Sequence, residues 1–149
     1  EKAKIIRIHI GGDFYSQAYF DAWLKVADNN PEVFFYAYTK SIPYWIARKQ
    51  ELKKIKNLVL TASYGGTHDH LISKYRLRNC KVLLTQEDAD EQKLIVDHDD
   101  SNAMSKKVKK FALLMHGNQP AGSLAAKIWR KNRKIQGYSR KGKKLKELL

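Results

Sequence analysis

The chain has 149 residues, of which 43% are hydrophobic, and it carries a formal net charge of +14. That length and apolar content favour one globular domain with a sizeable core. The sequence has no secretory leader pattern and no apolar run near the roughly 20 residues of a membrane helix. Its one cysteine, Cys80, excludes an internal disulfide and fits a reducing cytoplasmic setting.

The first predicted element is a buried strand over residues 5–10 that leads into a tight turn. Its isoleucines give the β-branched pattern of a strand. Gly11 and Gly12 allow a sharp turn, Asp13 adds a carboxylate, and Ser16 fits the N-cap of the next helix. This combination indicates a ligand-facing edge in an α/β protein. The alternative is an ordinary strand–helix turn in which Asp13 is solvated.

Hydrophobic periodicity then predicts alternating helices and strands along the chain. Helices are expected over residues 18–27, 44–54, 71–75 (short) and 124–134, and strands over residues 33–38, 58–62, 81–85, 94–96 (short) and 110–115. Such alternation predicts the α/β class, with a parallel sheet or part of a β/α barrel, and we expect a partial β/α barrel of mainly parallel strands. We assign residues 1–134 to this domain and residues 135–149 to a basic C-terminal tail.

Polar and glycine residues gather directly after the predicted strands. In parallel α/β folds the carboxyl ends of the strands share one edge, and ligands bind there. The alternative is that loops are polar in any case. The ligand or cofactor site expected at this edge consists of Gly11, Gly12, Asp13, Thr39, Lys40 and His116.

The acidic run 97–100 is a candidate for a divalent metal, because carboxylates and imidazole suit several ions. Adjacent residues of an extended chain point to opposite sides, so Asp97 and Asp99 are the expected ligands. The alternative is a solvated acidic turn in which Asp100 or Ser101 caps the next segment of the chain. His9, inside an apolar strand, is expected to be a core histidine with satisfied hydrogen bonds.

Positive charge is concentrated at the C-terminal end, where residues 127–149 hold ten Lys or Arg and one Glu. Basic residues with a nearby aromatic, here Tyr138, suit a nucleic-acid backbone, RNA or DNA. A merely solubilising tail is the alternative. The residues expected to contact nucleic acid are Arg130, Lys131, Arg133, Lys134, Arg140, Lys141, Lys143 and Lys144.

Three segments, residues 7–17, 35–40 and 111–123, resemble the phage gene-product-eighty-eight-like family over most of the chain. That family is distantly similar to radical S-adenosylmethionine proteins. The resemblance implies a phage origin, an incomplete β/α barrel, and the cytoplasm of an infected host cell as location. It also places residues 11–14 where those enzymes have a Gly-Gly-Glu-Pro turn, which contacts the amino group of the cofactor S-adenosylmethionine.

The chain departs from radical enzymes in one respect. Those enzymes carry a three-cysteine motif upstream of the glycine turn, whereas here only a few residues precede it and Cys80 is the one cysteine. The chain alone therefore cannot hold an iron–sulfur cluster. Either a preceding segment is missing or the scaffold serves another use.

These observations leave three functional hypotheses. The leading one is association with nucleic acid through the basic C-terminal region. The second is an S-adenosylmethionine- or nucleotide-dependent enzyme that uses the strand-end edge. The third is a virion or host-interaction component with no chemistry of its own.

Overall fold

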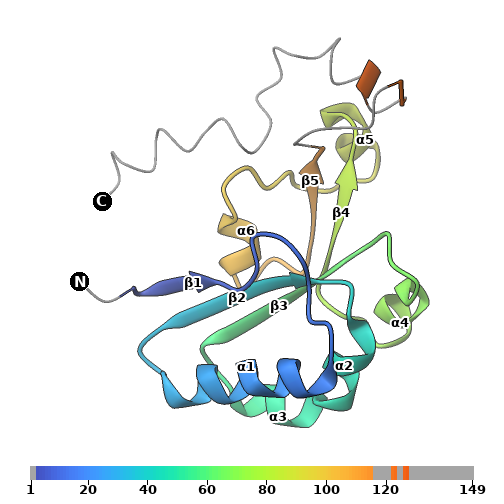
Figure 1. The fold of residues 1–149 in the computed structure, drawn as a ribbon. Helices are drawn as coiled ribbons and strands as arrows, with labels where there is room; N and C mark the ends of the chain where they lie inside the picture. Colours follow the sequence, from blue (N-terminus) through green and yellow to red (C-terminus); the bar gives the residue numbers. More distant parts are fainter. Residues whose placement is uncertain (1–2, 116–121, 124–125, 128–149) are drawn as a thin grey trace.

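The computed structural model describes residues 3–115, 122–123 and 126–127. Its centre is one sheet of five parallel strands in the order β1-β2-β3-β4-β5, which is also their order in the chain (Figure 1). The strands are β1 (Ile5–Arg7), β2 (Phe34–Thr39), β3 (Leu58–Ser63), β4 (Asn79–Leu83) and β5 (Lys110–Leu114). The helices are α1 (Gln17–Asn29), α2 (Ile42–Ala47), α3 (Lys49–Lys54), α4 (Asp69–Lys74), α5 (Gln86–Glu91) and α6 (Ser101–Met104).

The expected α/β class with parallel strands is confirmed. Each strand pairs with the next one along the chain after a helical connection, as parallel strands require. Over the described residues the sheet is open and does not close into a barrel.

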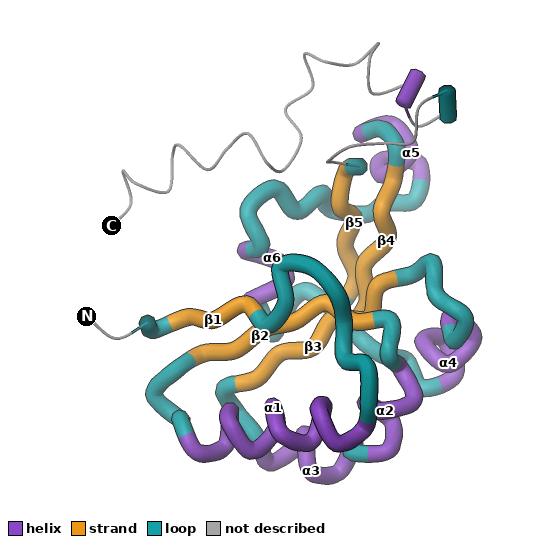
Figure 2. Tube along the Cα trace, viewed as in Figure 1, coloured by secondary structure: helices purple, strands orange, loops and turns teal. Residues whose placement is uncertain are grey.

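The sheet has a weak seam in its middle. β2 and β3 share five paired positions, and so do β4 and β5, but β3 and β4 share two, Ala62 with Asn79 and Ser63 with Cys80. Figure 2 shows the result: β4 and β5 rise away from β1, β2 and β3.

The two faces of the sheet are covered differently. Helices α1, α2, α3 and α4 lie on one side, where Phe20 and Leu24 pack with Phe35 and Leu60 in the main core (Figure 1). The opposite face carries α6, and Phe111 packs there among other buried residues. We call these the helical face and the inner face.

The first strand and the second helix differ from their predicted bounds. β1 ends at Arg7, because His9 has a φ of 64°, which is incompatible with a strand. The predicted helix 44–54 is divided into α2 and α3 at Arg48, where φ is −116° and ψ is 22°.

Other differences lie in the second half of the chain. The predicted strand 94–96 is reduced to one bridge, Val96 to Ala112. The acidic stretch after β4 forms α5, whose N-terminus is a capping box between Thr85 and Asp88. The short helix α6 has no counterpart among the predicted elements. Of the predicted closing helix, the structure describes 126–127, which are helical; the rest lies outside the described residues, as does the boundary at 134.

None of the described helices has the length and apolar character needed to cross a membrane.

Candidate functional site

The strand-end edge brings together three of the predicted site residues. The Asp13 carboxylate accepts hydrogen bonds from the Thr39 hydroxyl at 2.6 Å and from the Lys40 backbone amide at 2.6 Å. It also accepts one from the Phe14 amide at 2.7 Å. The positive φ of Gly12, 81°, turns the chain into this position, a conformation that glycine adopts without a steric cost.

These contacts give Asp13 a structural role. Both of its oxygens bind groups of the protein itself, so the carboxylate ties the β1–α1 loop to the end of β2. Gly11 and Gly12 remain exposed, with nothing within 4 Å of where a Cβ would lie. His116, the sixth residue expected here, lies outside the described residues.

Lys40 extends this edge towards β3. Its ammonium group donates to the Ser63 hydroxyl at 3.1 Å, and its side chain lies against Gly66, where a Cβ would come within 3.2 Å of the Lys40 Cβ. Asp69 accepts from the amides of Gly65 and Gly66 at 2.9 and 3.0 Å and holds that loop. The loops after β1, β2 and β3 therefore meet, as the sequence predicted.

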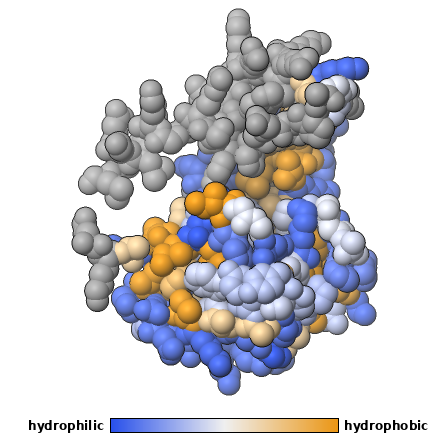
Figure 3. Space-filling model, viewed as in Figure 1, coloured by the Kyte–Doolittle hydropathy of each residue, from blue (hydrophilic) through white to orange (hydrophobic). Residues whose placement is uncertain are grey.

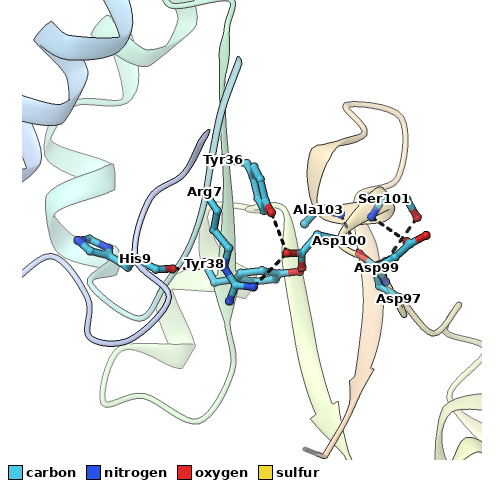
Figure 4. A network of polar contacts seen from close by, with 9 residues as sticks. All are labelled: Arg7, His9, Tyr36, Tyr38, Asp97, Asp99, Asp100, Ser101 and Ala103. Carbon is cyan, nitrogen blue, oxygen red and sulfur yellow. Dashed lines mark hydrogen bonds and ion pairs between the residues drawn. The ribbon is translucent and has the colours of Figure 1, made fainter. Parts of the chain in front are cut away.

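A second polar cluster, centred on Asp100, lies on the inner face (Figure 4). The buried Asp100 carboxylate accepts from the hydroxyls of Tyr36 and Tyr38 at 2.8 and 2.6 Å. It also pairs with the Arg7 guanidinium at 3.0 Å, and that group lies 5.1 Å from the centre of the Tyr38 ring. The Asp100 cluster thus joins the 97–105 segment to β1 and β2.

The electrostatics keep the two phenols neutral. Burial, and then the hydrogen bond to Asp100, raise the pKa of Tyr36 and of Tyr38 well above its ordinary value. Both tyrosines therefore act as hydroxyl donors to the Asp100 carboxylate over the physiological range.

The Asp100 cluster is a set of functional groups that the sequence pattern did not reveal. Tyr36 and Tyr38 alternate within the predicted strand 33–38, so they share the inner face. This alternation of side chains with polar ends is the sequence signal that could have revealed the cluster. The pairing with Asp100, more than 60 residues away, has no local signature.

Asp97 and Asp99 are engaged within their own loop. Asp97 is buried and accepts from the Ala103 amide at 3.0 Å, whereas Asp99 is exposed and accepts from the Ser101 amide at 3.1 Å. Burial raises the pKa of the Asp97 carboxyl, and the hydrogen bonds from Ser101 lower the pKa of Asp99. Over the part of the chain that the structure describes, no three His, Cys, Asp or Glu side chains are grouped to hold a metal. Metal binding by Asp97 and Asp99 stays a prediction that this geometry does not support.

His9 is half-buried and packs edge-on against the Phe14 ring at 4.7 Å. Its Nε2 forms a hydrogen bond with the Tyr19 hydroxyl at 3.1 Å, but its buried Nδ1 has no hydrogen-bond partner among the described residues. The expected core histidine is therefore only partly satisfied.

Ion pairs are few in the described part of the chain. Two ion pairs are present there: Arg7 with Asp100, and Arg48 with Asp21 at 2.7 Å.

In the view of Figure 3, hydrophilic residues cover the helices below the sheet, and hydrophobic residues gather towards β1. The predicted nucleic-acid residues from Arg130 to Lys144 lie outside the described residues.

Comparison with known proteins tests the predicted resemblance. The model of the family described as Gene product 88 matches residues 1–136. The Gene 88 protein of Mycobacterium phage L5 is 51% identical over 37 residues, which cover 25% of this chain and 16% of that protein. No solved structure matches the chain. The resemblance to radical S-adenosylmethionine proteins has no counterpart in these matches, but the phage family predicted from the three segments is confirmed: the chain belongs to the Gene product 88 family.

Proposed function

We propose that this phage protein associates with nucleic acid through the positive charge of its body and C-terminal region. The observation that carries the proposal is the scarcity of ion pairs. Several of the described carboxylates bind uncharged donors, and two form ion pairs with an arginine, so most lysines and arginines of the described residues have no carboxylate partner.

Four carboxylates illustrate the pattern. Asp69 binds two glycine amides, Asp88 binds the Thr85 amide, Asp97 binds the Ala103 amide, and Asp99 binds the Ser101 amide. Each negative charge stabilises a turn or a helix end and has no lysine or arginine of the described residues within ion-pair distance. With a net charge of +14, the molecule has the electrostatic character of a polyanion-binding protein.

The test is equilibrium binding of the full chain to fluorescent RNA, single-stranded DNA and duplex DNA between 50 and 300 mM salt. Binding that displaces counterions weakens linearly on a log–log plot, with a slope of about −0.7 to −0.9 for each phosphate neutralised. We expect a variant with Arg140, Lys141, Lys143 and Lys144 changed to Gln to bind more weakly and with a shallower slope. Absent binding, or affinity that does not change with salt, would contradict the proposal.

One observation favours a second candidate, a nucleotide- or S-adenosylmethionine-dependent activity. The exposed backbone of Gly11 and Gly12 leaves space for a ligand on the loop that Asp13 ties to Lys40. An iron–sulfur cluster does not fit the residues present, because Cys80 is single and fully buried.

Calorimetry with S-adenosylmethionine and with ATP tests this candidate. The informative variant is Lys40→Gln, since Asp13 variants would disturb the loop itself. Heat of binding in the unaltered chain that falls with Lys40→Gln would favour the activity, and no heat with either ligand would count against it.

A further inference from the structure

A groove of about 640 Å³ opens on the helical face, where α4, β4 and the start of β5 meet. Its polar lining includes Tyr64, Arg76, Asn79, Lys81, Lys109 and Lys110. The groove is distinct from the strand-end edge and from the Asp100 cluster.

The groove exists because the connections here are too short to cover the sheet. α4 and α5 have six residues each, compared with 13 in α1. The strand positions below it are polar: Asn79 of β4 pairs with Lys110 of β5, and Lys81 follows on the same face. On that face of β2 and β3 the corresponding residues are apolar, such as Phe35 and Leu60. These strand positions give the groove a polar floor, beside which the apolar side chains of Ile72, Leu77 and Leu94 also line it.

The charge of this groove has one sign. Four of its lining residues are cationic, and none of those that the structure describes is Asp or Glu. The four cations form no ion pairs within the described residues, and the Lys81 ammonium donates to the Gln92 side chain at 2.9 Å and lies 5.5 Å from the Tyr64 ring centre.

A second groove, between α1 and α3, provides the contrast. Its lining mixes Lys25, Arg48 and Lys54 with Asp21, Asp28 and Glu51, and Arg48 pairs with Asp21. Both grooves contain lysines, but only in the one beside β4 do the described lining residues leave the positive charges without nearby carboxylates.

We propose that the groove beside β4 binds the phosphodiester backbone of a single-stranded nucleic acid. This inference rests on the proposed function and assigns it a surface within the folded domain. Arg76, Lys109 and Lys110 are exposed and can each reach a phosphate, while Tyr64 offers a half-exposed ring to a base. A cavity of this size holds a ligand of small-molecule dimensions, that is, one or two nucleotides of a flexible strand. A duplex keeps its bases paired and stacked, so it cannot offer one to Tyr64 as a single strand can.

The test compares two triple variants that remove the same charge. The groove variant combines Arg76→Asn, Lys109→Gln and Lys110→Gln; Asn is chosen because residue 76 has a φ of 50°, which Asn tolerates. The control variant combines Lys25→Gln, Lys53→Gln and Lys54→Gln, which are exposed residues of α1 and α3. Circular dichroism and thermal melts establish that both fold.

The probe is a fluorescent 12-nucleotide single strand, as RNA and as DNA, with a matched duplex and poly-glutamate as competitors. We expect the groove variant to lose about tenfold or more in affinity and to flatten the log–log salt slope by about 2. The control should lose no more than about threefold.

The outcomes separate the two proposals. If the unaltered chain binds no nucleic acid, both fail. If it binds but the two triple variants weaken equally, or if duplex binds as tightly as the single strand, nucleic-acid association stands and the groove assignment is wrong. If poly-glutamate of the same total charge displaces the single strand, the partner of the groove is an acidic protein, and its assignment to nucleic acid is wrong.

Discussion

At the scale of single residues, Asp100 has the largest predicted effect on stability. Asn keeps its size and tolerates its φ of 63°, but it replaces one acceptor oxygen with a donor facing Arg7, Tyr36 or Tyr38. We expect Asp100→Asn to lower the free energy of unfolding by about 2–3 kcal/mol, the typical cost of losing hydrogen bonds to a buried charge. Urea denaturation measures this. Asp99→Asn, next to it but exposed, should cost less than about 1 kcal/mol, and equal losses would contradict the Asp100 assignment.

Cys80 predicts in which direction the stability of the fold changes with pH. Its thiol is fully buried, and burial raises its pKa to about 12, against the opposing effect of the Ser63 hydrogen bond. In the unfolded chain the thiol ionises near its ordinary pKa of about 8.5. The unfolded state therefore loses this proton first as pH rises, and stability falls from about pH 8.5 upwards until the folded thiol also ionises.

By pH 10, ionisation of this thiol in the unfolded chain should lower the free energy of unfolding by about 2 kcal/mol. Lysines and tyrosines titrate in the same range, so the comparison must be with Cys80→Ala, which removes this thiol alone. We expect the alanine variant to be less stable at pH 7 but to lose less stability than the unaltered chain between pH 8 and pH 10. Parallel pH profiles of the two proteins would be inconsistent with a buried, protonated thiol.

At the scale of elements, local patterns predicted the five strands of the sheet and the first helix, while their exact ends depended on contacts distant in sequence. Ser16 does cap α1, and its side chain accepts from the Tyr19 amide. The break at Arg48 has no local signal, because it coincides with a bidentate pair to Asp21 of α1, 27 positions away. The short apolar run 94–96 reaches the sheet at one position only, since Asp97 then turns inward to hold α6.

The strand-end edge supplies the element-scale prediction. An Asn at position 13 would set its amide donor against a donor of Lys40 or Thr39, because both Asp13 oxygens accept. We expect Asp13→Asn to destabilise the fold by about 1–3 kcal/mol. Thermal denaturation measures this, with Asp28→Asn on the exposed face of α1 as the matched control. An unchanged melting temperature for the Asp13 variant would mean that this carboxylate is free for a ligand after all.

At the scale of the whole molecule, the sequence predicted the class of sheet and the meeting of the strand-end loops. It did not predict the groove beside β4, because Arg76, Lys81 and Lys109 are separate in sequence and become neighbours only when β4 pairs with β5. The Asp100 cluster could not be predicted for the same reason, because Asp100 is more than 60 positions from Tyr36 and Tyr38. Charge patterns along a chain reveal runs of cations, such as the tail, but not surfaces assembled from several loops.

The weak seam between β3 and β4 predicts that the sheet opens in two steps. β3 is buried at each of its six positions and pairs with β2 along five, whereas β4 is attached to β3 at two positions and leaves Val82 49% exposed. We therefore expect native-state hydrogen exchange to show β2 and β3 as the most protected strands, and β4 with β5 as a unit of lower opening free energy.

Arg78 lies across this seam and makes the prediction testable by substitution. Its guanidinium donates to the Thr61 hydroxyl of β3 at 2.9 Å, to the carbonyl of Asn102 in α6, and to the carbonyls of Ser105 and Val108, which lie between α6 and β5. Arg78→Gln should lower the protection of β4 and β5 while leaving that of β2 and β3 unchanged, because it removes a side-chain connection between β3 and the segment that leads into β5. Exchange that rises equally in all five strands would show that the sheet opens as one cooperative unit and that the seam has no energetic consequence.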